Sequence, residues 1–192
     1  LHTGRKEEKM RTTSLVRLAA LLAATGLIGC QTQSPASASG SAADLVEAWN
    51  YVGGKLTDMA EDFPEDKYDY RPTPEVRSFG EHLLHIAEAN YFFIRSARGE
   101  EGGEEHASDE QKSKADIAAE LKQSFAEVAA AIEQAGDAGM SRTLKHPFAD
   151  RTISQHSLWL MAIENAGEHY GSLVVYYRLN GIVPPASRRA DK

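Results

Sequence analysis

Four long segments of the chain repeat apolar residues every three or four positions, the spacing that places them on one face of an α-helix. These segments are residues 43–62, 79–98, 113–135 and 152–180. The first carries one apolar stripe of Leu45, Trp49, Val52, Leu56 and Met59. No convincing alternation of β-branched residues, which would indicate strands, appears in the chain. Helices that are apolar on one face must bury it together, so the sequence predicts an all-α four-helix bundle with functional sites between facing helices.

Local signals predict where these helices begin and end. Ser78 is followed three residues later by Glu81, and Thr152 by Gln155, a spacing typical of the capping box that begins a helix. We therefore expect the second helix to begin directly after Ser78 and the last one directly after Thr152. Gly136 is expected to end the third helix, because glycine readily adopts the left-handed conformation found just beyond a helix.

Three loops connect the predicted helices. Residues 63–77 contain three prolines, and Tyr68 and Tyr70 within them are expected to pack back onto the bundle. Residues 99–110 are rich in glycine and glutamate. Residues 137–151 form a longer loop. We assign no functional role to the three remaining histidines of the body, which are His106, His146 and His156.

The N-terminal part of the chain has the features of an export signal. An apolar run at residues 15–28 follows the basic Arg11, and it is short for a membrane span but suits the core of a signal peptide. It ends in Leu-Ile-Gly-Cys, which resembles the lipobox of bacterial lipoproteins, in which Cys30 becomes the lipidated first residue. Residues 1–29 are thus predicted to be a signal peptide with an upstream extension, with Met10 as the start. The alternative is an uncleaved anchor helix or a free buried cysteine.

The remaining domain assignments follow from composition. Residues 30–41 comprise the lipidated cysteine and a flexible tether of small and polar residues, which cannot bury a core. Residues 42–187 are predicted to form the bundle, and residues 188–192 a C-terminal tail. The protein is therefore expected to be exported and membrane-anchored through its lipid, on the periplasmic or cell-surface side.

Net charge excludes one class of partner. The chain has a formal charge of −7, and because residues 1–29 carry five basic and two acidic residues, the part beyond them has −10. Nucleic-acid binding depends on lysine and arginine that release counterions from phosphates, so no nucleic acid is expected as a partner.

Polar residues interrupt the apolar faces of two helices. At 100° per residue, Asn165 and His169 lie in the middle of the apolar face of the last helix. In the second helix, His82 lies on the apolar side and His85 at its edge, so either could face His169. Burying such groups is costly without a partner, so they must meet another polar group, a water or a metal. The alternative is a core histidine that merely bonds a carbonyl or a tyrosine.

Two segments resemble a known family. Residues 78–91, SFGEHLLHIAEANY, and residues 168–185, EHYGSLVVYYRLNGIVPP, are similar to the DinB-like family of bacterial proteins. The resemblance implies a four-helix bundle, often dimeric, in which three histidines hold a divalent metal. One lies on the second helix, and two are spaced H-x-x-x-H on the last. The second-helix ligand corresponds to His85 and the final ligand to His169, whereas the remaining position is occupied by Asn165.

This departure bears on the cofactor that the resemblance implies. Imidazole nitrogen suits zinc, nickel or iron, whereas the amide of Asn165 is a weaker ligand for them, so occupancy of the site is expected to be lower. His82, one turn from His85, is a candidate substitute. Some relatives are thiol-dependent transferases, but an exported protein lacks the cytosolic thiol pool.

Two functions are compatible with these features. The first is a divalent-metal-binding lipoprotein, a metal-dependent transferase or hydrolase of unknown substrate, in which Tyr91 or Tyr176 helps to position a small-molecule ligand. The alternative is a non-enzymatic binding or structural lipoprotein with a degenerate metal site. Gly167 and Gly171 would allow close approach of a second helix, so a homodimer is a further expectation.

Overall fold

The computed structural model describes residues 41–100 and 112–189, and within them it confirms the predicted four-helix bundle. The bundle consists of α1 (Ala42–Asp62), α2 (Phe79–Arg98), α3 (Lys114–Met140) and α4 (Gln155–Leu179). A 3-10 turn, η1 (Glu65–Lys67), follows α1, and a short helix, α5 (Pro185–Arg189), follows α4. Two short strands, β1 (Thr143–Lys145) and β2 (Thr152–Ser154), lie between α3 and α4. The predicted signal peptide, Cys30, the tether as far as residue 40, and His106 lie outside the described residues.

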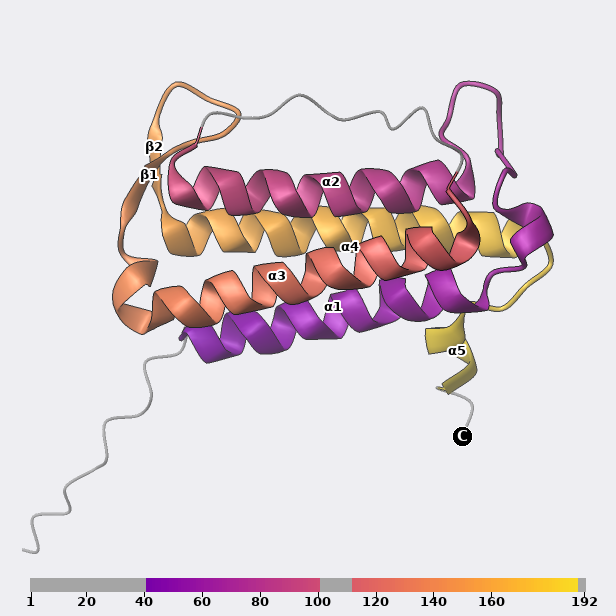
Figure 1. Cartoon of the computed structure of the whole chain (residues 1–192), viewed down its shortest axis with the longest axis horizontal. Coiled ribbons are helices and arrows are strands. Elements are labelled where there is room, and N and C mark those ends of the chain that lie inside the picture. Colours follow the sequence, from indigo (N-terminus) through magenta and orange to yellow (C-terminus); the bar gives the residue numbers. More distant parts are fainter. Residues whose placement is uncertain (1–40, 101–111, 190–192) are drawn as a thin grey trace, which may run out of the picture. The chain divides into compact units, whose positions relative to one another are not determined.

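The four helices do not simply alternate in direction. Helices α1 and α4 run one way along the bundle, and α2 and α3 run the other way (Figure 1). The end of α2 and the start of α3 therefore lie at opposite ends of the bundle. Helix α3 packs against both α1 and α2, and α4 packs mainly against α1 and α2. The predicted site residues meet where α2 and α4 pack together.

Large side chains fill the core near one end of the bundle. Phe63 stacks on Phe79 with ring centroids 3.9 Å apart, and Tyr177 packs against Phe63 at 4.9 Å. All three are fully buried. Further along, the buried Trp49 donates its indole N–H to the carbonyl of Phe125 at 2.9 Å, so its polar atom is satisfied inside the core.

The predicted cap of α2 is confirmed. Ser78 accepts a hydrogen bond from the backbone N–H of Glu81, and the Glu81 carboxylate accepts one from the N–H of Ser78. The loop before this cap also follows the prediction. Tyr68 is buried and donates its hydroxyl to the carbonyl of Ala60, and Tyr70 packs edge-on against Tyr176.

The predicted start of the last helix is wrong. Thr152 pairs with Lys145 in the antiparallel β1–β2 hairpin, where no strand was expected. Helix α4 begins after Ser154, which accepts a hydrogen bond from the N–H of Ser157 at 3.1 Å. The strands are three residues long, too short to show an alternating pattern in the sequence.

The predicted end of α3 is also revised. Gly136 does break the helix, with φ of 55° and ψ of −177°, but one further turn follows and extends to Met140. That turn holds the start of α1, because the Asp137 carboxylate accepts a hydrogen bond from the N–H of Ala42 at 2.7 Å. The sequence did not predict α5 either. Arg188 on α5 forms an ion pair with Asp62 at the end of α1.

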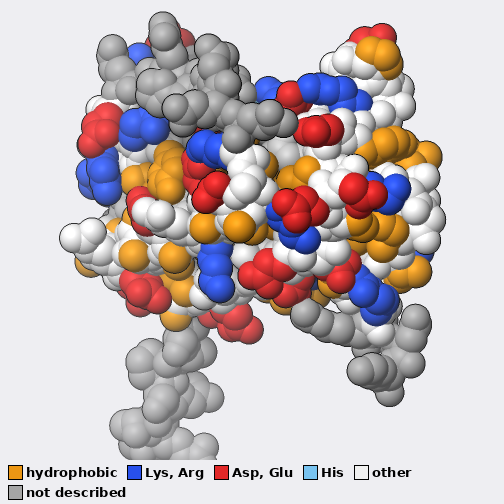
Figure 2. Space-filling model, turned by 45° about the vertical axis from the view of Figure 1, so that its right-hand side comes forward, with side chains coloured by type: hydrophobic (Ala, Val, Ile, Leu, Met, Phe, Trp, Pro, Cys, Tyr) orange, Lys and Arg blue, Asp and Glu red, His pale blue; other side chains and the backbone are white. Residues whose placement is uncertain are grey.

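Charged side chains of both signs are interspersed with apolar ones over the face seen in Figure 2, and no large area of that face carries a single sign. Within residues 41–100 and 112–189, no helix combines the length and the apolar character needed to cross a bilayer.

Candidate histidine site between α2 and α4

Three imidazoles meet between the second and fourth helices. His82 and His85 lie one turn apart on α2, three residues being close to one turn of helix, and His169 lies on α4. The ring centroid of His169 is 4.9 Å from that of His82 and 5.1 Å from that of His85. Both contacts are edge-to-face, with interplanar angles of 87° and 81°. The sequence left open which α2 histidine faces His169, and the structure places both against it.

A hydrogen bond joins two of these rings directly. His82 Nε2 lies 2.8 Å from His169 Nδ1, and the Asn165 amide nitrogen lies 3.4 Å from His169 Nε2. With the Asn165 amide nitrogen as donor, His169 Nε2 is the acceptor, and a neutral His169 then carries its proton on Nδ1, which faces His82 Nε2. Asn165, His169 and His82 thus form one chain of hydrogen bonds, all three being half-buried.

The environment of the site keeps two of the imidazoles neutral. Burial, with the neighbouring His85 and Arg77, lowers the pKa of His169 to about 4. Burial, with His169 itself and the same neighbours, lowers the pKa of His82 to about 4 as well. A neutral imidazole has a lone pair that can accept a hydrogen bond or bind a metal. Near neutral pH both side chains therefore remain in the form that can act as a ligand.

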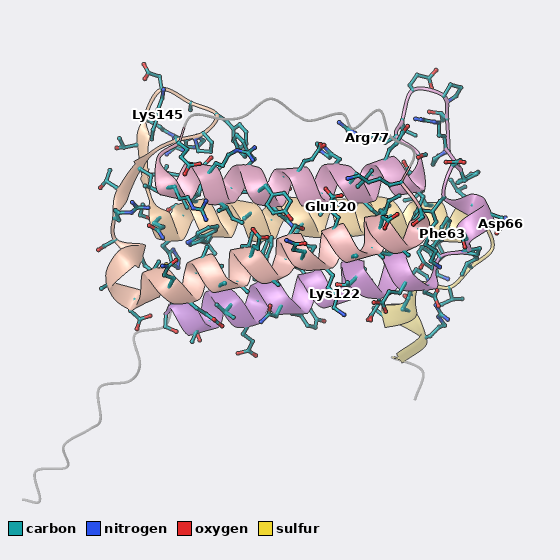
Figure 3. The ribbon with its side chains drawn as sticks, in the orientation of Figure 1. Phe63, Asp66, Arg77, Glu120, Lys122 and Lys145 are labelled. Atoms are coloured by element: carbon teal, nitrogen blue, oxygen red, sulfur yellow. The ribbon has the colours of Figure 1, made fainter. Side chains whose placement is uncertain are left out.

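Arg77 is a member of the site that the sequence alone did not reveal. It precedes the α2 cap, at the start of that helix (Figure 3). Its charge lowers the pKa of both His82 and His169. Its carbonyl accepts a hydrogen bond from the hydroxyl of Tyr176 at 2.6 Å. No local pattern marks this position, because its role depends on the approach of α4.

The two tyrosines proposed as substrate-positioning residues lie in different places. The ring of Tyr176 is 5.7 Å from that of His82, so it borders the site, but its hydroxyl is used by the Arg77 carbonyl. Tyr91 is half-buried, and burial followed by Glu127 and Glu120 raises its pKa. Those carboxylates belong to α3, so Tyr91 lies near that helix.

The donor set suits a metal that prefers nitrogen. Three imidazoles match zinc, nickel or iron, whereas an amide does not. Their present arrangement differs from that of a metal site: among the described residues, no group of three or more His, Cys, Asp or Glu side chains is placed to hold an ion. Ligands about 2.0–2.1 Å from a tetrahedral zinc have nitrogens roughly 3.3–3.4 Å apart. The 2.8 Å bond between His82 and His169 would have to open first.

Other residues named from the sequence lie outside this cluster. Gly167 and Gly171 are exposed, and a Cβ atom at either would meet nothing within 4 Å. His146 is buried in the hairpin, where its Nδ1 accepts a hydrogen bond from the N–H of Phe148 at 3.0 Å.

The chain thus forms a four-helix bundle in which α1 is parallel to α4 and α2 is parallel to α3 (Figure 1). A cluster of histidines lies between α2 and α4. The DinB superfamily model matches residues 43–173, which is most of the chain, and the chain therefore belongs to the DinB superfamily. No curated protein matches it significantly in sequence.

Three solved structures have a similar fold. A DinB-like protein from Bacillus cereus superimposes with a TM-score of 0.66 at 16% identity, covering 76% of this chain and 97% of that one. The DinB-like protein YjoA from Bacillus subtilis gives 0.58 at 23% identity, covering 72% and 92%. YfiT from Bacillus subtilis, described as a probable metal-dependent hydrolase with an unusual four-helix bundle topology, gives 0.59 at 16% identity, covering 73% and 88%.

Proposed function

We propose that this protein is an exported, lipid-anchored member of the DinB superfamily that binds a divalent transition metal between α2 and α4. The observation that carries the proposal is the contact of His82, His85 and His169, three imidazoles from two helices. Isolated core histidines need one partner each, whereas a cluster of three imidazole donors is what a zinc, nickel or iron site requires.

His82 has the central place in this proposal. Asn165 occupies the position at which the family resemblance expects a third imidazole, and its amide is a poor ligand for these metals. His82 lies nearer to His169 than His85 does, and its lowered pKa keeps it unprotonated near neutral pH. We assign the three ligands to His82, His85 and His169, with Asn165 as a hydrogen-bonding neighbour of His169.

For the reaction we propose a class, metal-dependent hydrolysis, and no particular substrate. A metal held by three protein ligands supplies an open position at which water or a thiol becomes a nucleophile near neutral pH. Hydrolysis is favoured over thiol transfer, since an exported site is separated from cytosolic thiols and YfiT is described as a probable hydrolase. The residues of this chain would bind and orient the small-molecule substrate.

A second candidate function rests on the hydrogen bonds themselves. Asn165, His169 and His82 are hydrogen-bonded to one another. This favours a non-enzymatic binding or structural lipoprotein in which the ancestral metal site has degenerated.

Metal analysis separates the two functions. Tag-free protein, dialysed and then loaded with zinc or nickel, is expected to hold one equivalent, and His82→Gln is expected to hold much less. Asn165→His adds an imidazole and is expected to bind more tightly than the wild type. If the wild type and His82→Gln both remain metal-free while Asn165→His binds one equivalent, the degenerate-scaffold function is correct.

The membrane anchor is tested independently of the metal. Acylation at Cys30 would place the protein in the membrane fraction of the producing bacterium and add the mass of the acyl groups to the N-terminal peptide. Cys30→Ser is expected to abolish both. An unmodified Cys30 in a protein recovered from the soluble fraction would contradict the proposed anchor.

A further inference from the structure

The β1–β2 hairpin carries an exposed aromatic side chain that the bundle holds in place. Phe148 lies between the two strands, and 67% of it is exposed. Its ring stacks on Phe92 of α2, with centroids 5.5 Å apart and planes at 23°. The N–H of Phe148 donates to Nδ1 of the buried His146. The Phe148 ring is thus exposed and held in place at the hairpin tip by Phe92 and His146.

Basic side chains flank this ring. Lys145 and Arg151 are exposed, and they stand on either side of the hairpin tip, with Asp150 as the acidic residue between them. The backbone N–H of His146 bonds the carbonyl of Arg151 at 2.8 Å, which holds the two sides of the tip together. An otherwise acidic chain, with a net charge of −7, thus carries an exposed aromatic side chain and two exposed cations on this hairpin tip. That combination suits the interface of an anionic lipid bilayer.

The hairpin lies at the end of the bundle that the proposed tether enters. Helix α1 begins at this end, and the hairpin with Lys145 is found at the same end (Figures 1 and 3). Eleven residue steps separate Cys30 from Ser41, a reach of about 40 Å at most at roughly 3.6 Å per residue. A tether of this length gives the hairpin a millimolar-range effective concentration at the membrane, so that even a weak contact is populated.

We propose that the β1–β2 hairpin docks on the bilayer in which the lipid of Cys30 is inserted. The ring of Phe148 enters the interface, and Lys145 and Arg151 lie against the phosphates of anionic lipids. Docking orients the bundle with its hairpin end toward the membrane and with η1 and α5 away from it. This inference rests on the proposed lipid anchor.

Tryptophan fluorescence tests the docking in the full-length, acylated protein. Phe148→Trp is reconstituted into vesicles of phosphatidylethanolamine and phosphatidylglycerol that contain brominated lipids, which quench nearby tryptophans. The matched control is Leu179→Trp, because Leu179 is 58% exposed and lies at the opposite end of α4. The native Trp49 and Trp159 are fully buried and contribute the same background to both variants.

The expected result is that the fluorescence added by Phe148→Trp is quenched several-fold more strongly than that added by Leu179→Trp, with a blue-shifted emission. Adding Lys145→Glu and Arg151→Glu to Phe148→Trp is expected to remove most of this quenching. Lys122→Glu, a charge reversal at an exposed position of α3, is expected to leave it unchanged. The melting temperature of each variant verifies that the bundle is folded.

Two failures are distinguishable. If the mass of the N-terminal peptide shows acyl groups on Cys30 but Phe148→Trp is quenched no more than Leu179→Trp, the hairpin does not dock, and the anchor remains. If Cys30 carries no acyl group, the anchor and the docking that rests on it are both wrong.

Discussion

His82 on α2 and His169 on α4 share a hydrogen bond of 2.8 Å between Nε2 and Nδ1, 87 residues apart in the chain. One of the two nitrogens must carry the proton and the other must accept it, so the accepting ring must be neutral for the bond to form. The bond therefore links the packing of two helices to the protonation of the candidate site.

Acid should destabilise the protein through these two histidines. Their pKa of about 4 in the folded protein lies below the value of 6.5 expected for an unfolded histidine. Between these values the unfolded chain binds more protons, so their stabilising contribution is complete above pH 6.5 and is lost as pH falls toward 4. Urea unfolding in the presence of a chelator, at about pH 7.5, 5.5 and 4.5, measures the loss.

The double variant His82→Gln/His169→Gln provides the comparison for this experiment. It retains polar side chains of similar reach but removes both titrations. Its stability is expected to fall less between about pH 7.5 and 4.5 than that of the wild type. Parallel pH profiles for the two proteins would show that other groups govern acid unfolding.

Two neighbouring glycines of α1 should respond in opposite ways to alanine. A Cβ at Gly53 would lie 2.5 Å from Cδ1 of Phe125, whose ring is held against Trp49 at 4.7 Å, so Gly53→Ala should cost about 1–3 kcal/mol. A Cβ at Gly54 would meet nothing within 4 Å, so Gly54→Ala should stabilise by roughly 0.5–1 kcal/mol through helix propensity. Thermal unfolding of both variants measures the effects, and a stabilised Gly53→Ala would contradict the packing described here.

The revised start of α4 can be tested at two positions. Ser154 caps the helix through the N–H of Ser157, so Ser154→Ala should lower the free energy of unfolding by about 1 kcal/mol. Thr152 is an exposed strand residue, and Thr152→Ala should change it by less than about 0.5 kcal/mol. Equal losses in denaturant unfolding would argue against this assignment of the cap.

A buried tyrosine should contribute through its hydroxyl. Tyr177 is fully buried and donates to the carbonyl of Met59 at 2.8 Å, and burial raises its pKa. Tyr177→Phe leaves that carbonyl without this donor and should cost about 0.5–1.5 kcal/mol. Tyr51→Phe is the matched control, because Tyr51 is 68% exposed and should change little. Similar unfolding midpoints for the two variants would show that the hydroxyl of Tyr177 adds nothing.

Much of the helical framework could be predicted from local signals. Apolar residues at helical spacing predicted all four helices, and Ser78 with Glu81 predicted the start of α2 to the residue. The same wheel placed Asn165 and His169 on one face of the last helix, as the structure has them. Such features depend on residues within one or two helical turns of each other, and these residues are close together in the sequence. The signal peptide, the lipid on Cys30 and the dimer remain predictions.

Only the tertiary structure determined which distant segments of the chain pack against each other. The hairpin forms because Leu144 pairs with Ile153 across a loop. Strands of three residues are too short to show a periodic pattern in the sequence. Both α2 histidines contact His169 because α4 packs against α2 at this height, which a helical wheel of either helix alone does not contain. The charge of Arg77 lowers the pKa of His82, and its backbone carbonyl accepts a hydrogen bond from Tyr176. Neither effect could be recognised from a local sequence pattern. Helix formation is a local property of this sequence, whereas the site is created by the packing of helices whose hydrogen-bonded histidines lie 87 positions apart.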